Sequence, residues 1–369
     1  MRVIVIGGLG NFGARICRRL AMEPGLELVA TGRKPVSGST FFGPLSAITT
    51  APLDIDSPRL QSQLADLRPQ LVIHCAGPYQ GQDYRVALAA CAVGAHYLDL
   101  SDGRDFVADF RANVHTAASA AGVLAVSGAS TLPGLSTAVV DQLSAGWARL
   151  DSVQVAIAPG QQAPRGEATI KAVFGYAGQG FKRWHNGRWA TVHGWQNLRR
   201  FSFEGIGQRW GAACDVPDLE LFPARYPGVR EVSFHAALEL RIQHLGLWLV
   251  AALRRVGLPL PIAQHAARLN RWANVLLDRF GSDLGGMRVR LKGVGADGRG
   301  VECTWQLTAP GGNGPEIPCM ATVLLACKLA RGQLHQTGAM ACMGLLTLDE
   351  FAPEFARWGF AQRVEHTVT

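Results

Sequence analysis

Several signatures of secreted, membrane and metal-binding proteins are missing from this chain of 369 residues. Its eight cysteines form no Cys-x-x-Cys pair, which argues against a zinc centre and a disulfide framework and is typical of reduced thiols. No uncharged apolar run reaches the roughly 18 residues of a membrane span. The nearest run, residues 245–262, contains two arginines and two prolines. Because the first apolar strand follows Met1 directly, no signal peptide is expected, and we predict a cytoplasmic protein.

Catalytic motifs of several large enzyme classes are also absent. No tyrosine is followed four residues later by lysine, so the catalytic pair of short-chain reductases is missing. The chain contains no Gly-x-Ser-x-Gly elbow, no His-Glu-x-x-His pair and no phosphate-binding Gly-x4-Gly-Lys-Ser/Thr loop. These absences disfavour hydrolase, metalloprotease and nucleoside-triphosphatase functions, and no metal site is predicted.

Charge is scarce and unevenly distributed. Charged residues make up 17% of the chain and apolar residues 48%, which is typical of a globular protein. Residues 1–150 carry a net charge of +1, so +7 of the total of +8 lies in residues 151–369. This excess could attract an anionic substrate or an anionic surface, although a merely basic surface explains it equally well. No run of Lys and Arg is long enough to indicate a nucleic-acid partner.

The first half alternates short apolar runs with helical patterns. We predict strands at residues 2–6, 26–31, 48–53, 71–75, 96–100 and 123–127. Helices are expected between them, at residues 14–22, 58–67, 83–93 and 102–121. Such alternation predicts an α/β fold with a Rossmann-type, doubly wound parallel sheet in the order 3-2-1-4-5-6, spanning residues 1–135.

The second half has a different pattern, with strands that pair locally. An Asn-Gly turn within residues 184–189 indicates a hairpin, and residues 287–294 and 301–307 alternate around an Asp-Gly turn. Helical patterns occupy residues 245–256, 262–280 and 320–330. We therefore predict an α+β domain with an antiparallel sheet at residues 136–335, serving substrate binding or dimerisation. The segment 336–369 is expected to return to the first domain.

The sequence GGLGNFG at residues 7–13 lies between the first strand and the first helix. Gly8 is expected to make the tight turn, Gly10 to let a pyrophosphate approach the backbone, and Gly13 to let helix and sheet pack closely. This context predicts a dinucleotide-binding turn, and the alternative is a glycine-rich turn without a ligand. The cofactor-binding residues predicted in this turn are Gly7, Gly8, Gly10, Asn11, Phe12 and Gly13.

The end of the second strand bears on the choice of nucleotide. NAD-selective folds place an acidic residue there, whereas this chain has Arg33 and Lys34. Two cations suit the 2′-phosphate of NADP, so NADP is favoured over NAD; the alternative is a solvated loop. Asp54, after the third strand, is placed to meet the adenine or to cap a helix. The residues expected near the nicotinamide are Ala76, Gly77 and Pro78.

Five segments together resemble the saccharopine dehydrogenase-like NAD(P)-binding oxidoreductases. They are residues 7–13, 53–56, 75–79, 95–102 and 128–136. The chain resembles the bacterial branch more than the enzymes that form saccharopine, because their Asp-Pro-Gly turn is Leu132-Pro133-Gly134 here. The resemblance implies hydride transfer to or from a C=N bond (an imine or secondary amine) or a C=O bond of a small carboxylate-bearing substrate.

Three polar residues near the end of the fifth strand are candidates for proton transfer. Tyr97 and Asp99 share one face of the strand, and Asp102 follows it. The alternative for either aspartate is capping of the next helix. Tyr79 could orient the nicotinamide or bind a substrate carboxylate, and it could equally serve packing.

Further candidates for binding a substrate carboxylate lie near and beyond the domain boundary. Pro133 and Gly134 open a helix whose free N–H groups could hold an anion, unless this is an ordinary helix start capped by Ser136. Arg165 and Lys171 are the first choice among the cations of the second half, although most such cations are solvated surface residues.

A function of another class is kept as an alternative. The chain could bind NADP without catalysis and use its basic second half to contact a protein or an anionic membrane surface. An amphipathic stretch around Trp248, Leu249, Leu253, Arg254 and Arg255 motivates this hypothesis. We prefer to interpret the stretch as a buried core helix.

Overall fold

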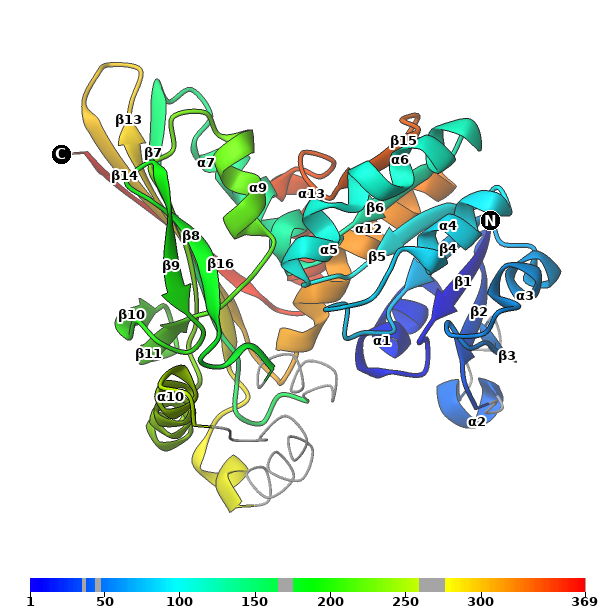
Figure 1. Cartoon of the computed structure of the whole chain (residues 1–369), viewed down its shortest axis with the longest axis horizontal. Helices are drawn as coiled ribbons and strands as arrows, with labels where there is room; N and C mark the ends of the chain where they lie inside the picture. Colours follow the sequence, from blue (N-terminus) through cyan, green and yellow to red (C-terminus); the bar gives the residue numbers. More distant parts are fainter. Residues whose placement is uncertain (35–37, 44–47, 165–174, 259–275, 369) are drawn as a thin grey trace. The chain divides into compact units, whose positions relative to one another are not determined.

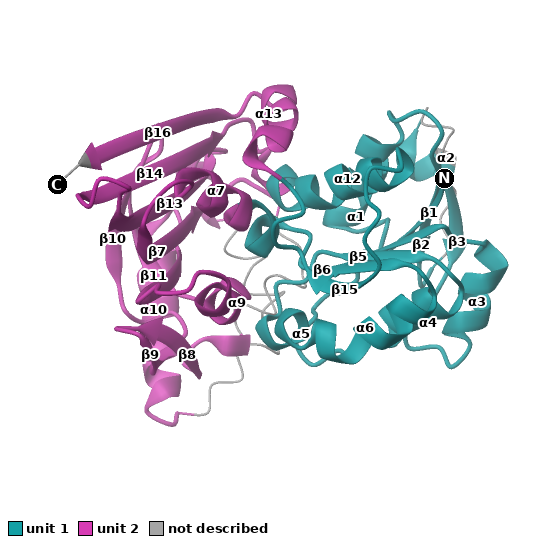
Figure 2. Ribbon diagram, turned by 90° about the horizontal axis from the view of Figure 1, so that it is seen from above, with its two compact units in different colours: residues 1–135, 316–346 teal, residues 136–315, 347–369 magenta. Residues whose placement is uncertain are grey.

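The chain forms two compact units, and each unit is built from two separate segments of the sequence. The computed structural model describes residues 1–34, 38–43, 48–164, 175–258 and 276–368 (Figure 1). The first unit comprises residues 1–135 and 316–346, and the second comprises residues 136–315 and 347–369 (Figure 2). The predicted boundary after residue 135 coincides with the boundary between the units.

A seven-stranded parallel sheet is the centre of the first unit. Its order, β15-β6-β5-β4-β1-β2-β3, contains the predicted order 3-2-1-4-5-6 and adds one strand. Strands β1 and β4 are almost wholly buried apolar runs, as expected for a parallel sheet covered on both faces. The strands are β1 (Arg2–Ile6), β2 (Glu27–Gly32), β3 (Ile48–Pro52), β4 (Leu71–His74), β5 (His96–Asp99), β6 (Leu124–Ser127) and β15 (Gly338–Ala341).

Helices cover both faces of this sheet (Figure 2). Helices α1 and α12 pack together on one face, and α3, α4 and α6 pack in series on the other. The long helix predicted at residues 102–121 is divided into α5 and α6. The helices are α1 (Asn11–Leu20), α2 (Gly38–Phe42), α3 (Leu60–Leu67), α4 (Arg85–Ala92), α5 (Arg104–Ala108), α6 (Phe110–Ala120) and α12 (Ile317–Ala330), with a π-helical turn η1 (Thr131–Leu135).

The division of the C-terminal third differs from the prediction. Helix α12 belongs to the first unit, where it packs against α1, although residues 316–335 were assigned to the second domain. Strand β15 does return to the first unit and pairs in parallel with β6. Residues 347–369 then go back to the second unit, so the prediction for 336–369 is right only up to residue 346.

A nine-stranded sheet forms most of the second unit. Its main path is β10-β11-β12-β7-β13-β14-β16, and β8 joins β12 to β9. The sheet is mixed rather than purely antiparallel, because β7 and β12 run parallel. The strands are β7 (Arg149–Ala158), β8 (Gly180–His185), β9 (Arg188–His193), β10 (Arg199–Phe203), β11 (Gly207–Ala213), β12 (Glu231–Ala236), β13 (Gly285–Val294), β14 (Gly300–Ala309) and β16 (Ala361–Val368).

Both predicted hairpins are present in this sheet. Trp184 pairs with Trp189 across β8 and β9, and Asn186 and Gly187 adopt the positive φ that a tight hairpin turn needs. Met287 pairs with Leu307 across β13 and β14. The helices of the unit are α7 (Ser136–Leu143), α9 (Asp218–Arg225), α10 (Arg241–Arg255) and α13 (Leu348–Arg357), with short helical turns η2 (Asp278–Phe280) and η3 (Gly314–Glu316).

Two predictions about helices of the second half have different outcomes. Most of the helix predicted at 262–280 lies outside the described residues. The stretch at 245–256 is a helix, α10, which begins four residues earlier than predicted. No helix in the described part of the chain is long and apolar enough to cross a membrane.

Candidate functional site

The glycine turn joins β1 to α1 at the carboxyl end of the sheet. Gly7, rather than Gly8, adopts the left-handed conformation, with φ of +75°. Gly7 N–H and Gly8 N–H both donate to the carbonyl of Thr31 at the end of β2. The tight turn predicted for Gly8 is therefore made one residue earlier, because the chain turns as soon as β1 ends.

Gly8 and Gly13 are required for close packing. A Cβ on Gly8 would lie 2.7 Å from the Ala30 Cβ, and one on Gly13 would lie 2.2 Å from the Gly7 carbonyl oxygen. Both distances are too short for real side chains, so Gly8 lets the turn lie against β2, and Gly13 lets helix α1 lie against the turn. This confirms the packing reason given for Gly13 and assigns a similar one to Gly8.

The N-terminus of α1 has unpaired donors. Gly10 is its N-cap, with no side-chain cap, and no acidic residue occupies the first turn. Within the described chain, the Asn11 Nδ2 is buried and has no hydrogen-bond partner. Its Oδ1 accepts a bond from Arg15, which also pairs with Glu316. A bare glycine turn, a helix N-terminus and an unpaired amide fit a pyrophosphate.

Arg33 and Lys34 follow β2 directly and are exposed. Neither forms an ion pair with a described residue. Asp54, after β3, accepts a bond from the Asp56 N–H, so it closes a local turn and does not cap α3. The three side chains therefore lie after adjacent strands of one parallel sheet, β2 and β3.

The loop after β4 is held by a residue that the sequence analysis missed. The amide of Gln82 donates to the carbonyls of both Ala76 and Pro78, at 2.8 and 2.7 Å, around the cis Gly77–Pro78 bond. One glutamine thus fixes the loop expected near the nicotinamide. An amide-bearing side chain shortly after Gly-Pro is the only signal that could have identified it.

Tyr79 points into the first unit. Its hydroxyl donates to the carbonyl of His74 at 2.7 Å, and its ring packs against Phe106. The side chain is buried, and burial raises the pKa of the phenol well above its usual value. The packing alternative therefore describes Tyr79, and its proposed role as a substrate or nicotinamide contact is not retained.

A buried polar chain runs through the ends of β4 and β5. The Tyr97 hydroxyl lies 3.1 Å from His74 Nδ1 and close enough to Asp99 to lower the pKa of that carboxyl. Burial lowers the pKa of His74 to about 4, and it raises the pKa of Tyr97 well above normal. His74 is therefore a neutral core histidine near pH 7.

Asp99 links the ends of strands β5 and β6 through hydrogen bonds. Its Oδ1 accepts from the Ser101 N–H, the Ser127 hydroxyl and the Gly128 N–H, at 2.9, 3.0 and 2.8 Å. Burial raises the pKa of Asp99 to about 6, and these three bonds oppose the rise. The carboxylate thus joins the end of β5 to the end of β6.

The predicted catalytic residues separate into buried and accessible groups. Tyr97 and Asp99 are 0% exposed, so neither can come within hydrogen-bond reach of a bound substrate, and their proposed catalytic role is corrected to a structural one. Asp102 is exposed, and its Oδ1 accepts from the Gln80 amide at 3.3 Å. Surrounding protein raises the pKa of the Asp102 carboxyl, and the Gln80 bond opposes this. No side-chain cap is present on α5, so Asp102 does not serve that purpose.

Pro133 and Gly134 do not offer an anion site. Both are buried, and a Cβ on Gly134 would lie 3.0 Å from the Ala321 Cβ of α12. The Ser136 side chain, at the start of α7, lies close enough to the buried carboxyl of Asp218 to lower the pKa of that carboxyl. Burial raises the pKa of Asp218 to about 7. The predicted role of Pro133 and Gly134 in binding a carboxylate is therefore wrong, because packing occupies their surroundings.

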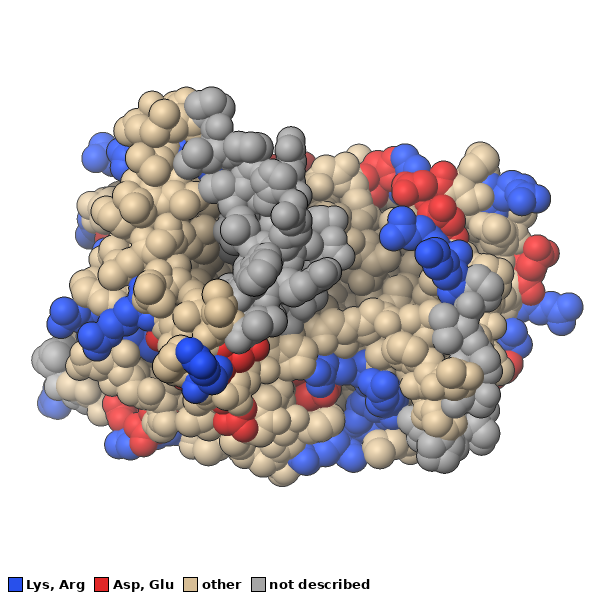
Figure 3. Space-filling view, turned by 90° about the horizontal axis from the view of Figure 1, so that it is seen from below, with Lys and Arg blue, Asp and Glu red and all other residues tan. Residues whose placement is uncertain are grey.

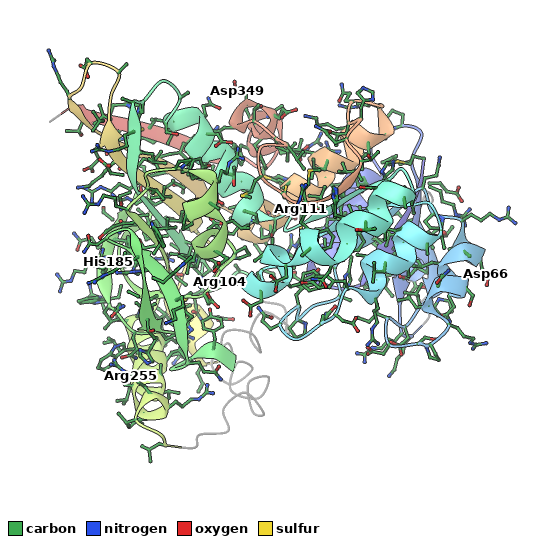
Figure 4. The ribbon with its side chains drawn as sticks, turned by 45° about the horizontal axis from the view of Figure 1, so that its top comes forward. Asp66, Arg104, Arg111, His185, Arg255 and Asp349 are labelled. Carbon is green, nitrogen blue, oxygen red and sulfur yellow. The ribbon has the colours of Figure 1, made fainter. Side chains whose placement is uncertain are left out.

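The cationic candidates Arg165 and Lys171 lie outside the described residues. Arg104, labelled in Figure 4, begins α5 two residues after Asp102 and is mostly buried.

Among the described residues, no group of three or more His, Cys, Asp or Glu side chains could hold a metal ion.

Comparison with known proteins identifies the fold. No protein-family model matches the sequence, and no curated protein matches it. Solved structures do match. Saccharopine dehydrogenase (L-Glu forming) from Saccharomyces cerevisiae superposes with a TM-score of 0.68 at 12% identity, covering 99% of each chain. Homospermidine synthase from Legionella pneumophila superposes with a TM-score of 0.61 at 8% identity, covering 100% of this chain and 91% of that one. The chain therefore has the fold of saccharopine dehydrogenase.

Proposed function

We propose that this chain is an NADP-dependent oxidoreductase of the saccharopine dehydrogenase-like group. The observation that carries the proposal is the turn between β1 and α1, where a Cβ at Gly8 or Gly13 would collide with the backbone or a neighbouring strand. The turn leaves helix N–H groups and the Asn11 amide for a diphosphate. The similar Legionella structure is described in complex with NAD, which supports a nicotinamide dinucleotide as the cofactor.

The proposed cofactor site extends along the carboxyl ends of four strands. Gly7, Gly8, Gly10, Gly13 and Asn11 would hold the pyrophosphate. Arg33 and Lys34 would bind the 2′-phosphate, and Asp54 lies after the neighbouring strand, toward the adenine. The loop Ala76–Gly77–Pro78, which Gln82 holds by two hydrogen bonds, would border the nicotinamide. Ligands bind outside the carboxyl ends of such strands.

The proposed reaction is hydride transfer to the carbon of a C=N or C=O bond in a small, carboxylate-bearing substrate, or, in the reverse direction, from the carbon of the corresponding C–N or C–O single bond. The nicotinamide, when bound, supplies or accepts the hydride. Asp102 would exchange the proton: as a carboxylic acid it donates to the substrate nitrogen or oxygen during reduction, and as a carboxylate it accepts that proton during oxidation. The raised pKa of the Asp102 carboxyl favours its protonated, proton-donating form. A cytoplasmic location, and a role of the second unit in substrate binding or dimerisation, remain predictions.

Removing the two cations after β2 is expected to change cofactor preference. In the Arg33→Ala/Lys34→Ala variant, affinity for NADPH should fall about 10- to 100-fold, because a charged hydrogen bond contributes about 1.5–3 kcal/mol. Affinity for NADH should stay within about twofold, which is under 0.5 kcal/mol. Calorimetric titration of the full chain with each nucleotide measures both effects.

The matched control is Arg68→Gly, which removes an exposed cation between α3 and β4 at a position that already has a positive φ of 51°. It should leave both affinities unchanged. Wild-type protein that binds NADH as tightly as NADPH would contradict the proposed NADP preference. Failure to bind either nucleotide would remove the basis for an oxidoreductase.

Replacing Asp102 tests the proton-transfer role. Asp102→Asn should lower turnover about 100-fold or more, since general acid–base catalysis contributes about 10²- to 10⁴-fold, while NADPH affinity stays unchanged. The assay follows NADPH absorbance with primary amines mixed with 2-oxo acids, and uses the most active pair. The pH profile of the wild type should lose one ionisation in the variant.

Asp105→Asn provides the control, because Asp105 is also an exposed aspartate and lies in the first turn of α5. Its turnover and pH profile should match the wild type. If both variants retain full activity, another group transfers the proton.

A further inference from the structure

Helix α10 is apolar on two opposite faces. Its inner face is buried through His244, Leu247 and Ala251, and it packs against β11. Its outer face would normally be polar, since a surface helix presents charged residues to water. Here the outer face carries exposed large apolar side chains, so burial does not explain all of the hydrophobic residues in this helix.

The exposed residues form one stripe. Ile242, Leu245 and Leu249 on α10 and Val256 at its C-cap are separated by three, four and seven residues, which places them along one side of a helix. Ile242 is 71% exposed and Val256 is 75% exposed. We call these four residues the outer stripe. The buried-core interpretation of this stretch is therefore only partly right.

Exposed apolar side chains are concentrated in this region. Of the eleven large hydrophobic residues exposed in the described part of the chain, seven lie between residues 242 and 280. The rest are scattered singly along the sequence, which is normal for a protein surface. Such a concentration marks an interaction site.

The charged residues of helix α10 itself are all basic. Residues 240–258 contain Arg241, Arg254 and Arg255 and no acidic residue. Arg241 and Arg255 are exposed, and Figure 4 labels Arg255 at the end of α10. Figure 3 shows the underside of the view in Figure 1, where α10 lies; its left part is largely uncharged surface, with Lys, Arg and some Asp and Glu toward the edges. An apolar stripe between arginines matches the acyl–headgroup boundary of an anionic bilayer.

We propose that α10 docks the protein on an anionic membrane surface. The outer stripe enters the headgroup boundary, and Arg241 and Arg255 contact lipid phosphates. The helix lies on the membrane rather than crossing it. The inference is independent of the proposed oxidoreductase function, because its test needs neither nucleotide nor turnover.

A second copy of this chain fits the stripe less well. The stripe spans about 21 Å of helix, so a helix-on-helix contact would cover about 200 Å² per partner, against about 800 Å² in stable complexes. Antiparallel pairing of two α10 helices would also place Arg241 of one copy near Arg254 and Arg255 of the other, with no acid in residues 240–258 to compensate. Lipid phosphates satisfy the same arginines without this repulsion.

The test is flotation of the purified full chain with vesicles of phosphatidylcholine alone or mixed with phosphatidylglycerol. We expect binding to the mixed vesicles only, reduced by high salt. Leu245→Ser/Leu249→Ser should weaken it at least tenfold, and Arg241→Gln/Arg255→Gln should weaken it and remove its salt dependence. Met22→Ser, which removes an equally exposed apolar side chain from the first unit, should bind like the wild type.

Three results would overturn the proposal. One is absence of binding to anionic vesicles, and another is binding that the stripe variants leave unchanged. The third is self-association of the wild type in sedimentation experiments, together with no binding to vesicles. If the stripe variants abolish that self-association, the outer stripe binds a second copy of the chain. Circular dichroism of each variant checks that α10 and the sheet still form.

Discussion

Replacing Gly13 by alanine is expected to weaken nucleotide binding strongly. The new Cβ would lie 2.2 Å from the Gly7 carbonyl oxygen and 2.8 Å from the Gly8 Cα. Both atoms belong to the backbone, so no side chain can rotate away, and the turn must separate from α1. Overpacking of this kind costs about 1–3 kcal/mol or more in stability. It also displaces the N–H groups that would hold the pyrophosphate, so affinity for NADPH should fall at least about 100-fold, or 2.7 kcal/mol.

Gly246→Ala is the matched control for this prediction. Gly246 is an exposed glycine within α10, and a Cβ added there would meet no atom within 4 Å. Alanine at this position should stabilise the helix by about 0.5–1 kcal/mol and leave NADPH affinity unchanged. Calorimetry and thermal unfolding of both variants give the comparison. If Gly13→Ala binds NADPH normally, the turn between β1 and α1 is not the cofactor site.

The order of the first sheet could be predicted because its signals are local. Each strand is a short apolar run followed by a helix, and right-handed crossovers leave few possible orders. The position of α12 could not be predicted in this way. Its sequence, IPCMATVLLACKLA, is apolar on all sides and shows no periodicity that would reveal its packing partner. That partner, α1, lies about 300 residues earlier in the chain.

The cofactor turn and the catalytic candidates differ for a similar reason. The glycine spacing of residues 7–13 is a local requirement of the backbone, so the sequence reveals it. Strand alternation places Tyr97 and Asp99 on one face of β5, but it does not say whether that face is covered. Asp99 is covered by residues that donate hydrogen bonds to it from elsewhere in the chain. These are Ser127, at the end of the next strand, β6, and Gly128, in the loop that follows β6. Only Asp102, beyond the strand end, remains exposed.

Removing the Asp99 carboxylate is expected to loosen the edge of the sheet where the site is built. In Asp99→Ala, three buried donors lose their acceptor: the Ser101 N–H, the Ser127 hydroxyl and the Gly128 N–H. Each buried unpaired donor costs about 1–3 kcal/mol, so the free energy of unfolding should fall by about 4 kcal/mol or more. Hydrogen exchange at the amides of Ser101 and Gly128 should accelerate more than exchange in the strands of the second unit. Urea unfolding measures the overall loss.

Asp99→Asn separates the hydrogen bonds from the charge. The asparagine oxygen can still accept the three bonds, so this variant should be far more stable than Asp99→Ala.

The pH dependence of stability tests the charge of Asp99. The wild-type pKa of about 6 lies above the value of about 3.9 in an unfolded chain, so the folded state binds the proton more tightly. Asp99 therefore contributes stability at low pH that is lost as the pH rises from about 4 through 6, up to about 3 kcal/mol. Asp218, with a pKa of about 7, adds a loss of the same sign in both proteins. Relative to the wild type, Asp99→Asn should thus become more stable between about pH 4.5 and pH 7.5. If urea unfolding shows Asp99→Asn becoming less stable relative to the wild type over that range, the pKa of Asp99 is not raised by folding.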